Sequence, residues 1–276
     1  MNKIIRLAIA NLLLMPVILF AAEPQAELKN LEGVINIADT IGNENIAKRA
    51  ALAVGIANPK LKITILKMSV PDAVAAVGSG KADLILLDQR LPQKLRGKID
   101  YKLYRYAANP AVIAVNVKNT LNSITSQQLR DIFSGNIESW LPFTNAGYMI
   151  HRFGIKPEMP GAQPFNDKIM LQQRMTDKIY TLSSNEELQV VVCENEYSIG
   201  FCGFIPELNE NMKLLNVDGV EPSIKNIRDG KYKPVIYYYV CVAEKSGKPA
   251  RIFAGLLRKP ELDSVIIEAG LLPAAN

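Results

Sequence analysis

Short apolar runs alternate with stretches of helical periodicity through the first third of the chain. The runs that predict strands are 33–38, 62–67 and 82–87. The segments between them with apolar residues at helical spacing are 43–57 and 70–77. Asn58-Pro59 is expected to end the first helix, and Pro71 suits the first turn of the second. Such a β-α-β-α-β series builds a parallel sheet that is covered by helices.

The rest of the chain continues in the same style with different elements. The further strands that the pattern predicts are 102–107, 111–117, 149–153, 198–204 and the tyrosine-rich 235–243. The further helices are 125–134, 163–175, 184–194, 249–258 and 262–269. Thr125 and Ser184 are suitable N-caps for two of these helices. Two α/β lobes explain the series better than one continuous sheet.

The first 22 residues differ from the body of the chain. Lys3 and Arg6 precede an apolar run over 7–20, and the small residues Ala21 and Ala22 follow it. This order is typical of a cleaved secretory signal peptide. The apolar run is shorter than the roughly 20 residues that span a bilayer, and no cysteine follows it to carry a lipid anchor. The sequence therefore predicts export to the periplasm.

Composition narrows the class of protein without naming a ligand. The chain of 276 residues is 49% apolar and 21% charged, which excludes collagen-like and wholly disordered proteins. Without Lys3 and Arg6, 30 basic residues face 27 acidic ones, too mild an excess for a nucleic-acid partner. The cysteines are Cys193, Cys202 and Cys241. Their spacing does not suit zinc, and either a Cys193–Cys202 disulfide or three buried thiols is compatible with it.

Four stretches together resemble one family of receptors. The longest is 121–140, LNSITSQQLRDIFSGNIESW, and the others are YSIGF at 197–201, IRDGKYKPVIYYY at 227–239, and the end of 253–273. They resemble the PstS-like phosphate receptors of ABC importers, which have the type 2 periplasmic binding protein fold. The resemblance implies an α/β fold of two lobes, each with a mixed or mostly parallel sheet flanked by helices. Strands 111–117 and 198–204 resemble the two places where the family's chain crosses from one lobe to the other. The resemblance therefore assigns 27–110 and 214–276 to the first lobe and 111–213 to the second.

The resemblance also implies a small oxyanion, phosphate in the family, held between the lobes and delivered to the membrane subunits of an ABC importer. The positions that match the family's ligand groups are Thr40, Ser69, Asp88, Arg152 and Gly161. Arg152 would donate hydrogen bonds to two oxygens of the anion, and Asp88 would accept a hydrogen bond from an anion that still carries a proton. Pro71 and Asp72 stand where the family has a glycine-rich loop, and they remove a donor and add a negative charge.

These replacements leave a second hypothesis open, in which the same fold binds another protein as a structural component of the cell envelope. A third hypothesis, an enzyme, is poorly supported, because the chain has one histidine and none of the G-x-S-x-G, H-E-x-x-H or Walker motifs. The sequence predicts no catalytic residue, no metal site and no cofactor.

Overall fold

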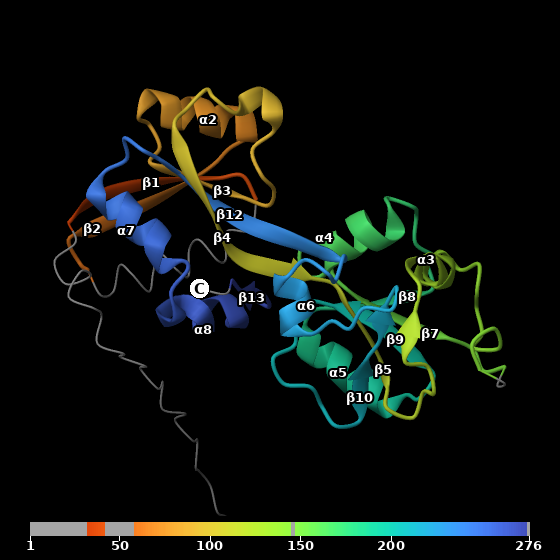
Figure 1. The fold of residues 1–276 in the computed structure, drawn as a ribbon. Helices are drawn as coiled ribbons and strands as arrows, with labels where there is room; N and C mark the ends of the chain where they lie inside the picture. The colour runs from red at the N-terminus through yellow and green to blue at the C-terminus, as the bar shows by residue number, and fades with distance from the viewer. Residues whose placement is uncertain (1–31, 42–57, 145–146, 275–276) are drawn as a thin grey trace, which may run out of the picture.

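The computed structural model describes residues 32–41, 58–144 and 147–274. It shows two lobes, each built on its own sheet and joined by long strands (Figure 1). The predicted signal peptide and the predicted helix 43–57 lie outside the described residues. No helix in the described part of the chain is both long enough and apolar enough to cross a membrane.

Lobe 1 is built on a six-stranded mixed sheet with the order β13-β4-β12-β3-β1-β2. Strands β1, β2 and β3 run parallel to one another, whereas β12 is antiparallel to β3 and β4. The strand bounds are β1 Gly33–Asp39, β2 Leu61–Lys67, β3 Leu84–Leu87, β4 Tyr101–Pro110, β12 Val235–Ala243 and β13 Leu272–Pro273. Strand β3 is buried at all four positions, as expected for a strand covered on both faces.

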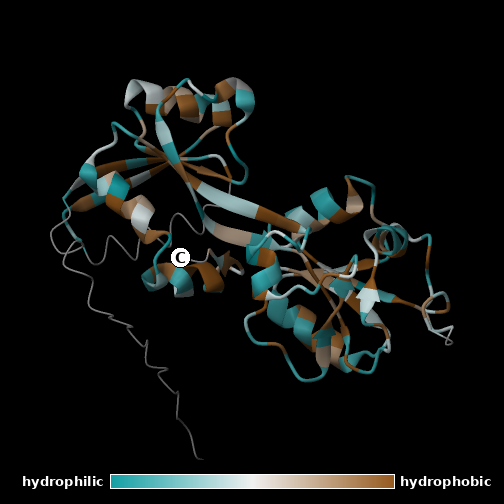
Figure 2. Cartoon of the chain, viewed as in Figure 1, coloured by the Kyte–Doolittle hydropathy of each residue, from teal (hydrophilic) through white to brown (hydrophobic). Residues whose placement is uncertain are grey.

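Helices cover both faces of the lobe 1 sheet. Helix α2 (Val70–Ser79) packs on one face, with Ser69 as its N-cap and Gly80 closing it at φ +78°. Helices α7 (Lys248–Leu256) and α8 (Asp263–Glu268) pack on the other face. The short 3₁₀ turns of this lobe are η1 Gln93–Leu95 and η3 Pro260–Leu262. The hydrophobic positions follow the sheets, while the outer faces of the helices are mostly hydrophilic (Figure 2).

Lobe 2 is built on a five-stranded sheet with the order β10-β5-β9-β7-β8. Its strands are β5 Val112–Asn116, β7 His151–Ile155, β8 Ile179–Leu182, β9 Ser198–Cys202 and β10 Met212–Leu214. A separate two-stranded pair joins β6 (Ser123–Ile124) to β11 (Asn216–Val217). The helices are α3 Ser126–Ser134, α4 Ala162–Pro164, the π-helix η2 Phe165–Met170, α5 Asn185–Glu194 and α6 Ile224–Arg228.

The capping signals of the sequence position α3 and α5 as predicted. Thr125 and Gln128 form a reciprocal capping box at the start of α3, and Gly135 ends that helix at φ +89°. Ser184 accepts the backbone N–H of Glu187 at the start of α5. The predicted helix 163–175 is different, because regular α-helix ends at Pro164 and a π-helix continues to Met170. Leu171 then adopts φ +53°, which stops the helix.

The return from lobe 2 to lobe 1 lies later in the chain than the sequence predicts. Strand β9 pairs with β5 and β7 inside the lobe 2 sheet, so 198–204 is not a crossing. The chain leaves lobe 1 where β4 ends at Pro110 and returns at Pro234, whose carbonyl accepts the N–H of Ala111 at 2.8 Å. Leu215, Ile227 and Tyr232 are buried in the lobe 2 core, so the expected boundary at residue 213 falls about twenty residues early for this packing.

All three cysteines are free thiols. Cys202 and Cys241 are buried in different lobes, and burial raises the pKa of Cys241 to about 12. The structure therefore has free thiols and no Cys193–Cys202 disulfide. Cys202 and Cys241 act as small apolar residues of the core.

Tyr232 offers a test of the late return to lobe 1. It is 1% exposed, and its hydroxyl donates to the carbonyl of Ala111 at 2.8 Å, so it ties the returning segment to the outgoing one. Burial raises the pKa of Tyr232, which keeps the hydroxyl protonated as a donor. Tyr232→Phe is expected to lower the free energy of unfolding by about 1–2 kcal/mol, because it leaves a buried carbonyl without this donor.

Chemical denaturation measures this change, and Tyr180→Phe is the matched control because Tyr180 is 65% exposed. The control is expected to stay within about 0.5 kcal/mol of the parent protein. Equal effects of the two substitutions would contradict the proposed role of the Tyr232 hydroxyl.

Candidate functional site between the lobes

The carboxyl ends of the three parallel strands of lobe 1 come together at one edge of the sheet. Asp39 is the last residue of β1, Ser69 follows β2 and Asp88 follows β3. In open α/β sheets, ligands bind outside the carboxyl ends of the strands. Three of the five predicted site residues, Thr40, Ser69 and Asp88, therefore lie on the edge where a ligand site is expected.

Two of the predicted hydroxyl donors are already used within the protein. The Thr40 Oγ1 donates to the carbonyl of Leu86 at 2.8 Å. The Ser69 Oγ donates to the Asp72 carboxylate at 2.6 Å while accepting the backbone N–H of Asp72. The N-terminus of α2 thus has its own internal anion, and Asp72 takes the position near the helix dipole that a bound anion would favour.

Asp88 and Gly161 lie at the junction of the two lobes. Gln163 of α4 donates from Nε2 to Asp88 Oδ2 at 3.2 Å, which joins lobe 2 to the end of β3. The backbone N–H of Gly161 donates to Asn109 Oδ1 at 2.7 Å, and Asn109 Nδ2 donates to the Tyr238 hydroxyl at 3.2 Å. Asn109 is 2% exposed on β4, so this junction is held by a buried polar network.

Gly161 cannot be replaced by a larger residue at this junction. Its φ is +92°, and a Cβ there would lie 2.3 Å from the carbonyl carbon of Cys202. The glycine therefore lets the loop after β7 approach the end of β9. A second contact between the lobes lies next to it, where the N–H of Phe204 donates to the carbonyl of Gly270 at 3.2 Å.

Two buried tyrosines, Tyr106 of β4 and Tyr238 of β12, lie beside the junction. The rings of Tyr106 and Tyr238 lie 6.3 Å apart, measured between their centroids. Burial raises the pKa of Tyr106 well above its ordinary value, and Tyr238, Asp39 and Asp88 raise it further. A phenol whose pKa is raised in this way stays protonated and can act as a donor.

A groove of about 380 Å³ flanks the junction. Pro160 and Asn185 line it from lobe 2, and Ile267 and Gly270 line it from lobe 1. Its charged lining residues are Glu158, Glu186 and Glu268. A fully deprotonated anion would therefore meet negative charge in this groove.

The guanidinium of Arg152, the predicted positive group of the site, is bound within lobe 2 and is not among the groups that make the junction. The residue is 2% exposed in lobe 2, and its guanidinium donates to three backbone carbonyls. Nε binds Ile132 at the end of α3 at 2.6 Å, and Nη2 binds Ile137 in the following turn at 2.5 Å. The arginine thus ties the last turn of α3 and the turn after it to β7. Burial lowers the pKa of the guanidinium and Glu138 acts in the opposite direction, but arginine keeps its charge in proteins.

Sequence reasoning missed the residues that make the junction. Asn109 lies between the predicted strands 102–107 and 111–117, and Gln163 is the first residue of the predicted helix 163–175. The only signal in the sequence was their place next to predicted strand and helix ends. Among the described residues, no group of histidine, cysteine or carboxylate side chains is arranged to hold a metal ion.

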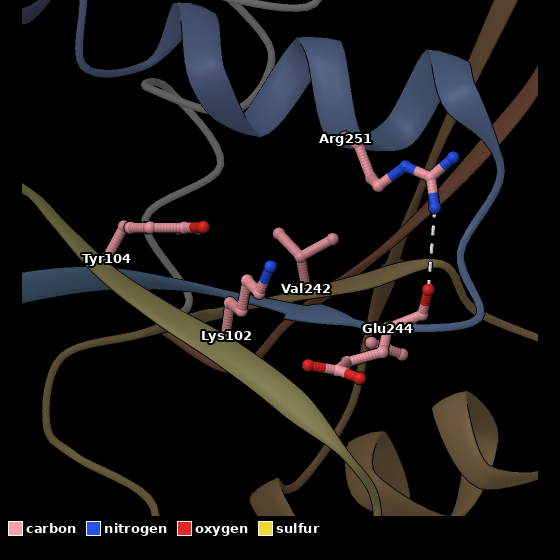
Figure 3. A pocket seen from close by; sticks show the side chains of 6 residues that line it. Lys102, Tyr104, Val242, Glu244 and Arg251 are labelled. Carbon is pink, nitrogen blue, oxygen red and sulfur yellow. Dashed lines mark hydrogen bonds between the residues drawn. The ribbon is translucent and has the colours of Figure 1, made fainter.

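A further hollow lies on lobe 1, and none of the predicted site residues is among its lining residues. It has a volume of about 230 Å³ and lies between β4, β12 and α7, with Lys102 and Arg251 on its border (Figure 3). Arg251 Nη1 donates to the backbone carbonyl of Glu244 at 3.5 Å. The guanidinium of Arg258 lies 4.8 Å from the Tyr104 ring centroid. Arg251 of this hollow therefore has a partner within the protein.

Comparison with known proteins identifies the architecture. A family model described as the PBP superfamily domain matches residues 32–259. The phosphate-binding protein PstS of Bacillus subtilis (strain 168) is 22% identical over 164 residues, which cover 59% of this chain and 54% of that protein. The match thus spans about half the length of this curated relative.

Two solved structures share the fold over most of this chain. An ABC-type phosphate transport receptor from Vibrio cholerae is 17% identical with a TM-score of 0.66, and covers 86% of this chain and 99% of its own. PstS from Borrelia burgdorferi is 15% identical with a TM-score of 0.69, and covers 89% of this chain and 100% of its own. The predicted two-lobed α/β fold of type 2 periplasmic binding proteins is confirmed.

Arg152→Met tests the role of the guanidinium. The substitution is expected to lower the free energy of unfolding by roughly 1.5–3 kcal/mol, because charged hydrogen bonds to buried carbonyls are lost. Denaturant titration measures it, with Arg174→Met as the control, because Arg174 is exposed and pairs with the exposed Asp177. A variant of unchanged stability that had lost affinity for phosphate would instead place Arg152 in a ligand site.

Proposed function

The chain belongs to the PBP superfamily, and on this premise we propose that it is a solute receptor that closes two lobes over a small oxyanion for an ABC importer. The observation that carries the proposal is the bridge from Gln163 to Asp88, which joins the lobes at the carboxyl ends of the lobe 1 strands. Phosphate is the ligand that the resemblance favours, because the curated relative is named a phosphate-binding protein. Binding and release, without a chemical step, are the whole of the proposed activity.

The chemistry of the junction restricts the form of the oxyanion. Asp88 offers a carboxylate, which can only accept hydrogen bonds when ionised, and Asp39 lies at the end of the neighbouring strand. An anion that still carries a proton can donate to such a carboxylate, whereas a fully deprotonated one is repelled. We therefore expect protonated phosphate to be preferred over sulfate, which has no proton to donate near neutral pH.

A second candidate function rests on a different observation. Four donor groups that match the family's anion contacts already have partners in the protein: the Arg152 guanidinium, the Thr40 and Ser69 hydroxyls and the Gly161 N–H. This arrangement favours a protein of the same fold that binds a partner in the cell envelope and no anion. Direct titration distinguishes the two candidates.

Isothermal titration with phosphate and with sulfate is the test. We expect measurable phosphate binding and weaker sulfate binding in the parent protein. Asp88→Asn is expected to reduce this preference about ten- to hundredfold, since its amide can also donate to a deprotonated oxygen. Asp177→Asn is the control, because this carboxylate lies on the exposed surface of lobe 2 beside Arg174. Absence of heat with both anions would reject the oxyanion receptor and favour the partner-binding function.

Residues 1–22 are proposed to direct export to the periplasm and to be removed there. Expression of the full chain in a Gram-negative bacterium, followed by fractionation and N-terminal sequencing, is expected to give a periplasmic protein beginning near Ala22 or Glu23. A control with Lys3→Glu and Arg6→Glu removes the positive charge of the leader and is expected to slow processing. A purified protein that keeps residues 1–20 would contradict the proposal.

A further inference from the structure

Lobe 2 contains a large groove that the proposed oxyanion site does not use. Its volume is about 670 Å³, and it lies on the face of the sheet that α4 and η2 cover in part. Strands β7, β8 and β9 form its floor, while Met175, Thr176 and Asp177 form its far wall. We call it the lobe 2 groove. Its volume is typical of sites for small organic ligands.

The groove exists because the helix that follows β7 ends early. The sequence predicts a regular helix to residue 175, but the π-helix η2 ends at Met170. Leu171 and Gln172 then have φ values of +53° and +65°, an uncommon backbone for residues other than glycine. The chain turns away at this point and leaves part of the β7–β8 face uncovered.

The floor of the groove is built around one aromatic ring. Phe201 of β9 stacks on Phe165 with ring centroids 3.8 Å apart and planes at 5°. A Cβ at Gly154 would lie 2.6 Å from the Phe201 ring, so only glycine lets the ring lie flat against β7. The groove therefore has a rigid apolar floor, extended by Ile155 and Ile179.

The polar lining of the groove is almost entirely uncharged. Gln163, Asn166, Thr176 and Thr181 supply amide and hydroxyl groups. The one charged lining residue is Asp177, whose carboxylate is bound by Arg174 at 3.1 Å. No basic side chain is among the described residues that line the groove, so nothing there compensates an anion.

From this lining, we propose that the lobe 2 groove is a second ligand site, which binds a small uncharged organic molecule with an apolar body and an amide or hydroxyl group. The apolar body packs beside Met175 and Ile179, above the buried Phe201 ring, and the polar group meets the amide and hydroxyl side chains of the wall. Gln163 lines the groove and also donates to Asp88 across the junction, so the groove adjoins the junction through this one side chain.

Benzamide and benzoate are suitable probes because they have the same shape and differ in charge. ¹H–¹⁵N correlation spectra of the protein are recorded while each probe is added. Benzamide is expected to bind at about millimolar concentration, the range for so small a molecule, and to shift the amide signals of Thr176 and Thr181. Benzoate is expected to bind at least tenfold more weakly.

The variants Thr181→Lys and Tyr180→Lys place the same new side chain on opposite faces of β8. Thr181 lines the groove, whereas Tyr180 stacks on Phe153 and does not line it. Thr181→Lys is expected to weaken benzamide at least tenfold and to strengthen benzoate, since the new ammonium enters the groove. Tyr180→Lys is expected to leave both affinities unchanged.

The proposal is overturned if neither probe binds the parent protein, if benzoate binds as well as benzamide, or if the two variants behave alike. Phosphate titration does not enter these outcomes. The oxyanion receptor and the lobe 2 groove can therefore fail independently.

Discussion

The hydrogen bond from the Gly161 N–H to the Asn109 side chain positions the two lobes against each other. Asn109 belongs to a strand of the lobe 1 sheet, and Gly161 precedes the first helical turn after β7 in lobe 2. The bond is 2.7 Å long and buried, so breaking it without a substitute leaves two polar groups away from water. Only a glycine at φ +92° brings the loop close enough to form it. The bridge from Gln163 to Asp88 depends on this placement, because Gln163 follows two residues later.

The predicted donor groups at the junction are bound within the protein, because nearby backbone and side-chain groups need hydrogen-bond partners. A helix leaves carbonyls unsatisfied at its end and N–H groups unsatisfied at its start. The Arg152 guanidinium binds the carbonyls of Ile132 in the last turn of α3 and of Ile137 after it, and the Ser69 and Asp72 pair satisfies the start of α2. The groups that could hold an anion by resemblance thus stabilise the elements on which they lie. The Asp88 carboxylate remains at the junction as a hydrogen-bond acceptor.

The predicted and observed elements differ where tertiary contacts overrule local signals. The gap expected between strands 102–107 and 111–117 lies inside the long strand β4, because nine of its ten residues pair with β12. The helix expected to residue 175 stops at Met170, because its π-helical turn ends in left-handed backbone at Leu171. Neither the length of β4 nor the end of the helix at Met170 depends on the residue types of a few consecutive positions. The periodicity of apolar residues therefore could not predict them.

Apolar periodicity and capping residues were enough to determine the class of fold and most element positions. The capping box of Thr125 and Gln128, the cap at Ser184 and the buried run 84–87 are local features with local causes. The motif over 121–140 was enough to indicate the family. The site depended on which groups meet in space and which are already paired. Arg152 has the right charge and lies in the lobe 2 strand β7, yet its guanidinium donates to the carbonyl of Ile132 in the last turn of α3, twenty residues earlier in the chain. The direction of a side chain is decided by the partners that folding brings to it, and these lie outside any motif of consecutive residues.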